Sequence, residues 1–157
     1  MLVLPLIERL EKIGPEAVKN WGAALKQARR LYEGSETYLF HGTSLSNAQS
    51  IVENGFLDKY GPDAGTSGDH HHVYWAGLDY AIGFAEKAAQ FDRPALLAAK
   101  LEDVLASGTA RPMTVFDRQL NEEVDAELDT WQESLAESGC IRVHRGRHVH
   151  GLIALGF

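Results

Sequence analysis

A histidine and a tyrosine, whose side chains are suited to ligand binding, stand beside short apolar runs in this chain of 157 residues. His41 follows the apolar residues 38–40 and precedes Gly42. Tyr74 belongs to a β-prone run at residues 73–76. Both runs are expected to form strands that carry the imidazole and the phenol at their ends. The two groups could then face one cleft.

A short helix and a loop should connect these two strands. Ser46 suits the N-cap of the helix, and Gln49 three residues later would complete a capping box. Three apolar residues between 48 and 52 give it one apolar face, and Gly55 is placed to end it in the left-handed conformation. The loop that follows, residues 59–69, is rich in Gly and Asp.

This ordered set resembles the catalytic core of the ADP-ribosyltransferases of the poly(ADP-ribose) polymerase and diphtheria-toxin type. Those proteins show a His-Gly-[Ser/Thr] strand end, an Asn-x-x-x-Ile-x-x-x-Gly-[Leu/Phe] helix and a Tyr-[Phe/Leu]-[Ala/Thr] strand. The resemblance covers about a third of the chain and extends to small and aromatic residues of the next helix. The matching residues are His41, Gly42, Thr43, Asn47, Ile51, Gly55, Phe56, Tyr74, Ala76, Ala81, Phe84 and Ala85.

The resemblance implies an enzyme that transfers ADP-ribose from NAD to an acceptor and releases nicotinamide. His41 would bind a ribose hydroxyl on the adenosine side, the main chain of Gly42 would hold the carboxamide, and Tyr74 would lie beside the nicotinamide. For an isolated histidine, a core position satisfied by a neighbouring carbonyl is the more common role, and the motif favours the ligand role here. The NAD-contacting set is then His41, Gly42, Thr43, Tyr74 and Tyr80, with Phe84 as an alternative second aromatic wall.

A carboxylate is expected as the third catalytic group, because the transition state resembles the oxocarbenium ion of glycoside hydrolysis. Many members of the family place a Glu at the start of a late strand, and the late strand here, residues 140–144, contains no acid. Glu137 is the nearest candidate by order. Glu122, Glu123 and Glu127 are alternatives on the preceding segment, where a run of acids is more often a solvated face. A missing acid is also compatible with a mono-transferase or with a domain that binds NAD without cleaving it.

Histidine and arginine gather in two further places. In the run 70–72 consecutive side chains of an extended segment point to alternate faces, so only His70 and His72 could bind one metal together. With one cysteine and no Cys-x-x-Cys or His-Glu-x-x-His motif, we expect exposed loop histidines and no metal. The second group either balances the acidic segment before it or meets phosphates, of NAD or of a nucleic-acid acceptor. Its members are Arg142, His144, Arg145, Arg147, His148 and His150.

Composition fits one soluble globular domain, with 45% hydrophobic and 24% charged residues. The net charge of −7 argues against broad nucleic-acid binding. No apolar run approaches the about 20 residues that span a bilayer, and the N-terminus has no signal-peptide pattern. The single Cys140 suits a buried site in a reducing compartment. We therefore expect a cytoplasmic location, or delivery into a target cell as an effector, and no membrane partner.

The remaining elements are predicted from periodicity and turn residues. Residues 5–33 should form two helices separated at Pro15, the second with an apolar stripe formed by Val18, Trp21, Leu25, Ala28 and Tyr32. This second helix should support the core, or else dock a neutralising partner. Further expected elements are a helix at 79–91, a strand or short helix at 95–101, a loop at 107–112, a strand at 113–116, a helix at 118–138 ended by Gly139, and a β-hairpin formed by 140–144 and 149–155.

We thus predict a single α+β domain, residues 1–157, with N-terminal helices as a cap at 1–34 and a catalytic core at 35–157. Two small antiparallel sheets would form a split cleft, as in the family it resembles. The small size is similar to a bacterial or phage mono-ADP-ribosyltransferase or toxin. Two other functions stay open: an NAD- or ADP-ribose-binding module without catalysis, and an NAD-dependent RNA 2′-phosphotransferase. The acceptor could be a protein, a nucleic acid or a small molecule.

Overall fold

The computed structural model describes residues 15–56, 72–88, 93–117, 122–125 and 130–156. Its class is α+β, as predicted. In sequence order the elements are α2 (Pro15–Glu33), β1 (Tyr38–Ser44), α3 (Leu45–Asn54), β2 (His72–Ala76), α4 (Leu78–Ala88), β3 (Pro94–Lys100), α5 (Leu101–Ala106), β4 (Thr109–Pro112), β5 (Thr114–Asp117), β6 (Glu122–Asp125), α6 (Trp131–Ser138), β7 (Cys140–His144) and β8 (Ile153–Leu155).

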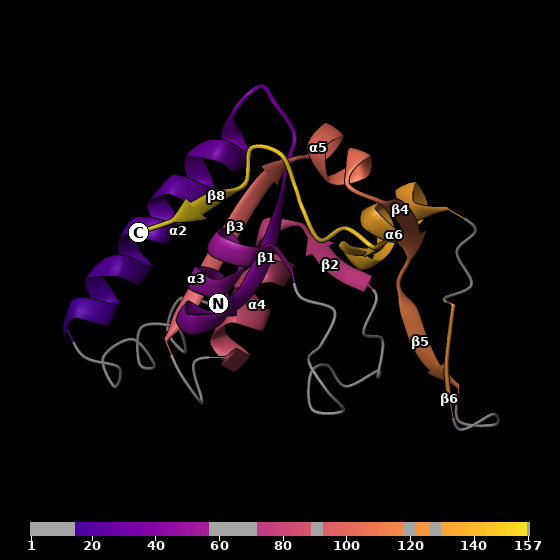
Figure 1. Ribbon diagram of the computed structural model, residues 1–157, viewed down its shortest axis with the longest axis horizontal. Helices are drawn as coiled ribbons and strands as arrows, with labels where there is room; N and C mark the ends of the chain where they lie inside the picture. Colours follow the sequence, from indigo (N-terminus) through magenta and orange to yellow (C-terminus); the bar gives the residue numbers. More distant parts are fainter. Residues whose placement is uncertain (1–14, 57–71, 89–92, 118–121, 126–129, 157) are drawn as a thin grey trace.

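Six of the strands form one antiparallel sheet in the order β4-β7-β2-β1-β3-β8. β5 and β6 form a separate two-stranded ribbon that extends away from β4 (Figure 1). Pairing is extensive within each half of the sheet: β1 pairs with β3 from Tyr38↔Lys100 to Ser44↔Pro94, and β2 pairs with β7 along its whole length. The two halves meet only at Phe40↔Ala76, the single register pair of β1 and β2. The two separate sheets that we predicted are therefore joined into one, through a narrow junction.

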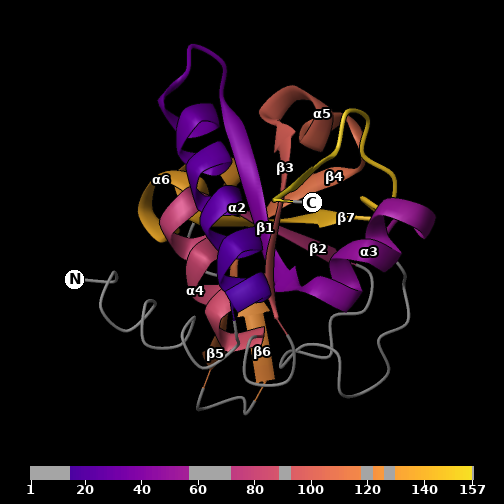
Figure 2. The ribbon, with the colours of Figure 1, turned by 90° about the vertical axis from the view of Figure 1, so that its left-hand side faces the viewer.

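Helices cover both faces of the sheet (Figure 2). α2 and α4 lie on one side of β1 and β3, and α3 and α5 lie on the other. Alternate residues of β1 supply the two cores, because successive side chains of a strand point to opposite faces. Phe40 packs with Trp21 of α2 and Ala81 of α4, whereas Leu39 packs with Ile51 of α3. All of these side chains are buried, which stabilises the fold by about 1.5–3 kcal/mol for each large one.

α2 supports the core through part of the predicted stripe. Trp21 and Ala28 are buried in the cluster beneath it, and Leu25 packs against that cluster. Tyr32 departs from the prediction because its side chain is 63% exposed near the end of the helix. In Figure 1 the helix lies alongside β3 and β8. The helix predicted before Pro15 lies outside the described residues.

The helix after β1 forms as predicted but its N-cap lies earlier in the sequence. The N-cap is Ser44, whose hydroxyl accepts a hydrogen bond from the Asn47 N–H at 3.3 Å, so the assignment of Ser46 as N-cap is wrong. β1 stays extended up to Ser44 because that residue still pairs with Pro94 of β3. Gly55 ends the helix with φ 74° and ψ −179°. The positive φ explains the glycine, although the conformation is not the left-handed helical one we expected.

The predicted helix over residues 118–138 is wrong in its first part. Glu122–Asp125 is the strand β6, in which Val124 pairs with Val115 of β5. The helix begins at Trp131, after Thr130 accepts a hydrogen bond from the Glu133 N–H at 3.2 Å. An apolar residue every third or fourth position cannot reveal a nearby strand partner, and here that partner decides the structure. Gly139 ends α6 in the left-handed conformation, as predicted.

The predicted C-terminal hairpin is also wrong. β7 lies between β2 and β4, whereas β8 pairs with β3 at the opposite edge of the sheet. The segment between them therefore crosses the molecule instead of turning back, although Arg145 has the positive φ of a turn residue. The predicted loop at 107–112 contains the strand β4, and residues 95–101 divide into the strand β3 and the start of α5. The helix predicted at 79–91 corresponds to α4, and residues 89–91 lie outside the described part.

Cys140, at the start of β7, is fully buried, as expected. Burial raises the pKa of its thiol to about 12, so at pH 8 only about one thiol in ten thousand is ionised. We expect an aromatic disulfide reagent at pH 8 to modify the native protein at least ~100-fold more slowly than the urea-unfolded protein. Following the released thiolate by absorbance measures both rates. Equal rates would contradict this burial.

No helix in the described part of the protein is long and apolar enough to cross a membrane.

Candidate functional site

The centre of the candidate site is the place where β1 and β2 separate. Beyond the single pair Phe40↔Ala76, no described strand pairs with β1 on its β2 side. His41, Gly42 and Thr43 follow directly after this pair, so the structure places the predicted His-Gly-Thr motif on the unpaired edge. Unpaired strand edges present backbone N–H and C=O groups that can bind another molecule.

The His41 ring is packed against two aromatic rings on the α3 side of the sheet. Its ring is 5.0 Å from that of Phe56 in an edge-on arrangement and 5.9 Å from that of Trp75, centroid to centroid. Its Nδ1 is 2.6 Å from the backbone oxygen of Tyr74. The imidazole thus has a neighbouring backbone carbonyl as its hydrogen-bond partner, as is common for histidines in protein cores. The same hydrogen bond links β1 to β2 where the two strands diverge.

The chemistry of this bond defines the protonation of the imidazole. A carbonyl oxygen can only accept, so Nδ1 carries the hydrogen. Burial lowers the pKa of His41 below its usual value, with the bond to the Tyr74 carbonyl acting in the opposite direction, and the ring is therefore neutral at pH 7. In the neutral ring Nε2 has no hydrogen and is a hydrogen-bond acceptor. It makes no hydrogen bond to any part of the protein that the structure describes.

Tyr74 lies on the opposite face of the sheet from the His41 imidazole. Residues alternate along β2, so Trp75 shares the face of His41, while Tyr74 packs against the cluster that contains Phe40. The contact between the two predicted site residues therefore passes through the Tyr74 backbone. Across the sheet, Tyr74 is directly opposite Arg142 of β7, which is opposite Arg111 of β4.

Gly42 is in direct contact with the backbone of α4. A Cβ atom on this residue would lie 1.9 Å from the Ala81 carbonyl oxygen and 2.8 Å from the Ala85 nitrogen. A side chain is therefore excluded at position 42 by the helix, independently of any ligand. Packing against α4 thus explains the glycine on the face where a Cβ would project, apart from the carboxamide contact that the resemblance implies for its main chain.

Tyr80 and Phe84 form an exposed aromatic pair on α4, with ring centroids 5.2 Å apart and exposed fractions of 38% and 40%. Gly139 lies beside the Tyr80 ring, and its carbonyl accepts a hydrogen bond from the Gly77 N–H at 2.9 Å. Partial burial, together with Cys140 nearby, raises the pKa of Tyr80, so its phenol is protonated at neutral pH. Partly exposed aromatic rings of this kind can stack on planar ligands.

Glu137 occupies the last turn of α6, two residues before Gly139, and its side chain is exposed. It makes no hydrogen bond or ion pair with the described residues, so nothing brings it to His41 or Tyr74. Glu122 and Glu123 are on β6 instead of the predicted helix, and Glu127 lies outside the described residues. The prediction that Glu122 and Glu123 lie on a helix is therefore wrong.

The basic residues near the C-terminus fall into two separate places. Arg142 and His144 belong to β7, where Arg142 is only 5% exposed and its Nε donates to the Pro112 carbonyl at 2.7 Å. His144 is opposite His72 in the sheet, with ring centroids 4.9 Å apart. Arg147 lies instead beside the end of α3, with its Nε donating to the Phe56 carbonyl. His70 and His71 lie outside the described residues, within which no three potential ligands gather to hold a metal ion.

Sequence reasoning used Phe56 only as a motif match and did not assign it a contact. Its position directly after the helix-ending Gly55 is the signal that could have placed it next to β1. Strand alternation indicates that Trp75 and Tyr74 lie on opposite faces of β2, but only the register of β1 and β2 brings Trp75 to His41. Both rings are fixed neighbours of the imidazole and limit how it can turn.

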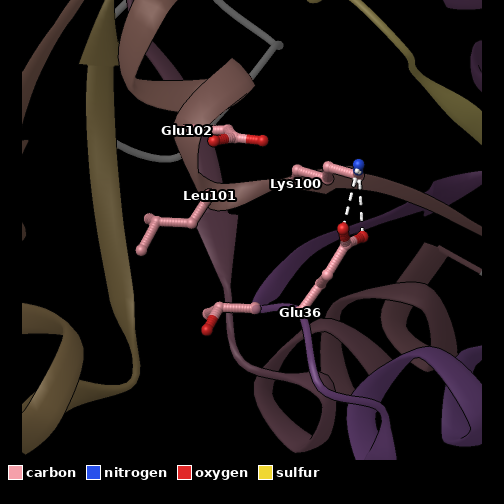
Figure 3. A pocket seen from close by; sticks show the side chains of 5 residues that line it. Glu36, Lys100, Leu101 and Glu102 are labelled. Atoms are coloured by element: carbon pink, nitrogen blue, oxygen red, sulfur yellow. Dashed lines mark hydrogen bonds and ion pairs between the residues drawn. The ribbon is translucent and has the colours of Figure 1, made fainter.

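A hollow of about 320 Å³ lies at the other end of β1 and contains none of the motif residues (Figure 3). Lys100 and Glu36 form an ion pair at its rim, with Nζ 3.2 Å from Oε2. The hydrogen bond from Lys100 to Glu36 raises the pKa of the lysine. Both groups are in solvent, so the pair contributes little to stability and does not mark a reactive site.

Comparison with known proteins gives no match: no family model, no curated protein and no solved structure is similar to this sequence.

Proposed function

We propose that this protein is an NAD-dependent ADP-ribosyltransferase that breaks the bond between nicotinamide and ribose and transfers ADP-ribose to an acceptor. The observation that carries the proposal is the unpaired edge of β1 at Gly42, next to a neutral imidazole whose Nε2 accepts hydrogen bonds. The order of motif residues along β1, α3 and β2 supports it. The narrow junction between the sheet halves is compatible with the split sheet of the family that the sequence resembles.

Each end of NAD has a proposed partner at this edge. A ribose hydroxyl on the adenosine side would donate to Nε2 of His41, which the Tyr74 carbonyl holds in the required tautomer. The nicotinamide carboxamide, which can donate one of its N–H groups and accept at its C=O, matches the backbone carbonyl and N–H of a single extended residue, Gly42. Thr43 continues this edge, and the nicotinamide would lie between the strands beside Tyr74, with Tyr80 or Phe84 as the outer wall.

The reaction needs positioning more than proton transfer. The C–N bond breaks with its electron pair leaving on nicotinamide, which departs neutral, and the ribose carbon becomes an oxocarbenium-like centre. The acceptor then forms a bond to that carbon and loses its proton. We assign to the Glu137 carboxylate the role of stabilising the positive charge on the sugar and orienting the acceptor. This assignment rests on sequence order.

The alternative of an NAD- or ADP-ribose-binding module without catalysis is favoured by one observation. Glu137 is exposed and makes no hydrogen bond or ion pair with the motif residues in the described part of the protein. A module of this kind would use the same edge and the same His41. It would bind NAD and release no nicotinamide.

The test is nicotinamide release from NAD by the purified protein, measured by chromatography with and without mixed bacterial protein or RNA. We expect release above the rate of a sample without enzyme, stimulated by whichever mixture contains the acceptor. The Glu137→Gln variant should release nicotinamide at least ~10-fold more slowly, and Glu133→Gln, a change at another exposed residue of the same helix, should not. A melting temperature raised by NAD without any release would establish the binding module instead. Neither binding nor release would refute both.

A further inference from the structure

A groove of about 500 Å³ lies between the C-terminal end of α3 and the segment 147–152 that leads to β8. It is separate from the edge of β1, and its volume is within the range of about 300–1,000 Å³ that is usual for small-molecule sites. The segment 147–152 belongs to the connection between β7 and β8, which crosses the molecule where a hairpin was predicted. The lining of the groove combines three basic residues, Arg147, His148 and His150, with apolar surface.

Arg147 is held in place at this groove by two hydrogen bonds with one residue. The Phe56 N–H donates to the Arg147 carbonyl at 2.8 Å, and the Arg147 Nε donates back to the Phe56 carbonyl at 3.0 Å. Gly55 is pressed against the same segment, since a Cβ there would lie 2.6 Å from the Arg147 oxygen. A guanidinium oriented in this way loses less conformational entropy when it binds an anion with its planar fork.

His148 and His150 line the groove next to Arg147, and both are exposed. The Nδ1 of His148 lies within 2.7 Å of where a Gly55 Cβ would be, so this imidazole is at the wall itself. Two imidazoles and a guanidinium offer N–H groups to phosphate oxygens, which accept several hydrogen bonds. Among the described residues that line the groove, the acidic one is Glu53, which is exposed.

The apolar part of the groove favours a ligand that also has an apolar surface. Val52 is 52% exposed, which is high for an aliphatic side chain, and it lines the groove together with the half-buried Leu152. A bare inorganic ion would leave this surface in water. A phosphate attached to a flat, weakly polar body would cover it, with a gain of about 25 cal/mol for each Å² of apolar surface removed from water.

We propose that this groove is a second ligand site, for a nucleoside monophosphate whose phosphate meets Arg147, His148 and His150 and whose base covers Val52 and Leu152. The site does not depend on the proposed function, because none of these residues belongs to the edge of β1. It also gives a role to Arg147, His148 and His150, the basic residues that lie in the groove and not on β7 with Arg142 and His144.

AMP is the probe, and isothermal titration calorimetry with the full-length protein is the measurement. We expect AMP to bind at least ~5-fold more tightly than adenosine or inorganic phosphate, because only AMP satisfies both parts of the groove. The double variant His148→Ala/His150→Ala should lower AMP affinity at least ~5-fold, and Glu53→Gln should raise it about 2-fold by removing a like charge. Arg147 is left unchanged because it also fixes Phe56.

His41→Asn separates this site from the proposed NAD site and should leave AMP affinity unchanged. AMP binding that disappears in His41→Asn but persists in the double variant would place the ligand at the edge of β1 and overturn the proposal. Absence of AMP binding at ~10 mM would overturn it as well. If the wild-type protein fails to cleave NAD yet binds AMP with these variant effects, only the proposed function is refuted.

Discussion

His41→Asn should lower nicotinamide release from NAD by about 10- to 100-fold. Asparagine can place its amide N–H near the position of Nδ1, so the hydrogen bond to the Tyr74 carbonyl is retained. It has no acceptor in the place of Nε2. The ribose hydroxyl would then lose its partner in a water-poor site, which costs about 1–3 kcal/mol and corresponds to that range of rates.

His41→Phe is the complementary variant. It keeps a ring against Phe56 and Trp75 but removes both nitrogens, so it should lose both activity and stability. Gln49→Ala, an exposed change on the adjacent helix α3, serves as the unaffected control. Release by His41→Asn at the wild-type rate would show that Nε2 has no part in NAD binding or cleavage.

The pH dependence of NAD binding gives a second check on the same nitrogen. Because burial lowers the pKa of His41, Nε2 remains unprotonated as the pH falls through the ordinary value of 6.5. Binding that depends on this acceptor should persist at pH 6.5 and weaken only below the lowered pKa.

Gly42→Ala should destabilise the protein by about 3 kcal/mol or more, or prevent folding, because the new methyl group would overlap the backbone of α4. Overpacking against a side chain can be relieved by rotation. The atoms here are the Ala81 oxygen and the Ala85 nitrogen, which can move only if the helix is displaced. Displacement would loosen the burial of Ala81 and Ala85, which are 1% and 0% exposed.

Gly83→Ala is the matched control on the helix itself. A Cβ at Gly83 has no neighbour within 4 Å, and alanine is the better helix former by about 0.5–1 kcal/mol, so this variant should be slightly more stable than wild type. Urea unfolding followed by circular dichroism measures both free energies of unfolding. If Gly42→Ala unfolds within about 1 kcal/mol of wild type, α4 does not rest on β1 as described. Gly42→Ala is accordingly unsuitable as a test of the carboxamide contact, since it changes the fold first.

Short-range features of the protein were predictable from sequence. The apolar runs around His41 and Tyr74 predicted β1 and β2, the periodic apolar residues predicted α2, α3 and α4, and glycine marked the ends of α3 and α6 at Gly55 and Gly139. These features depend on residues within a few positions of one another, where backbone sterics and capping hydrogen bonds act. The α+β class follows from them.

The tertiary structure decided everything that depends on strand partners. β6 formed where helical periodicity indicated a helix, because Val115 and its neighbours on β5 pair with it. β7 and β8 are far apart in the sheet because β7 pairs with β2 and β4, whereas β8 pairs with β3 at one edge. The same cause governs the site: strand alternation and the single junction Phe40↔Ala76 place His41 with Trp75 and Phe56 and put Tyr74 on the other face. Each strand can pair with several others, and the pairing that forms depends on the packing of the whole protein, so a local sequence pattern does not predict it.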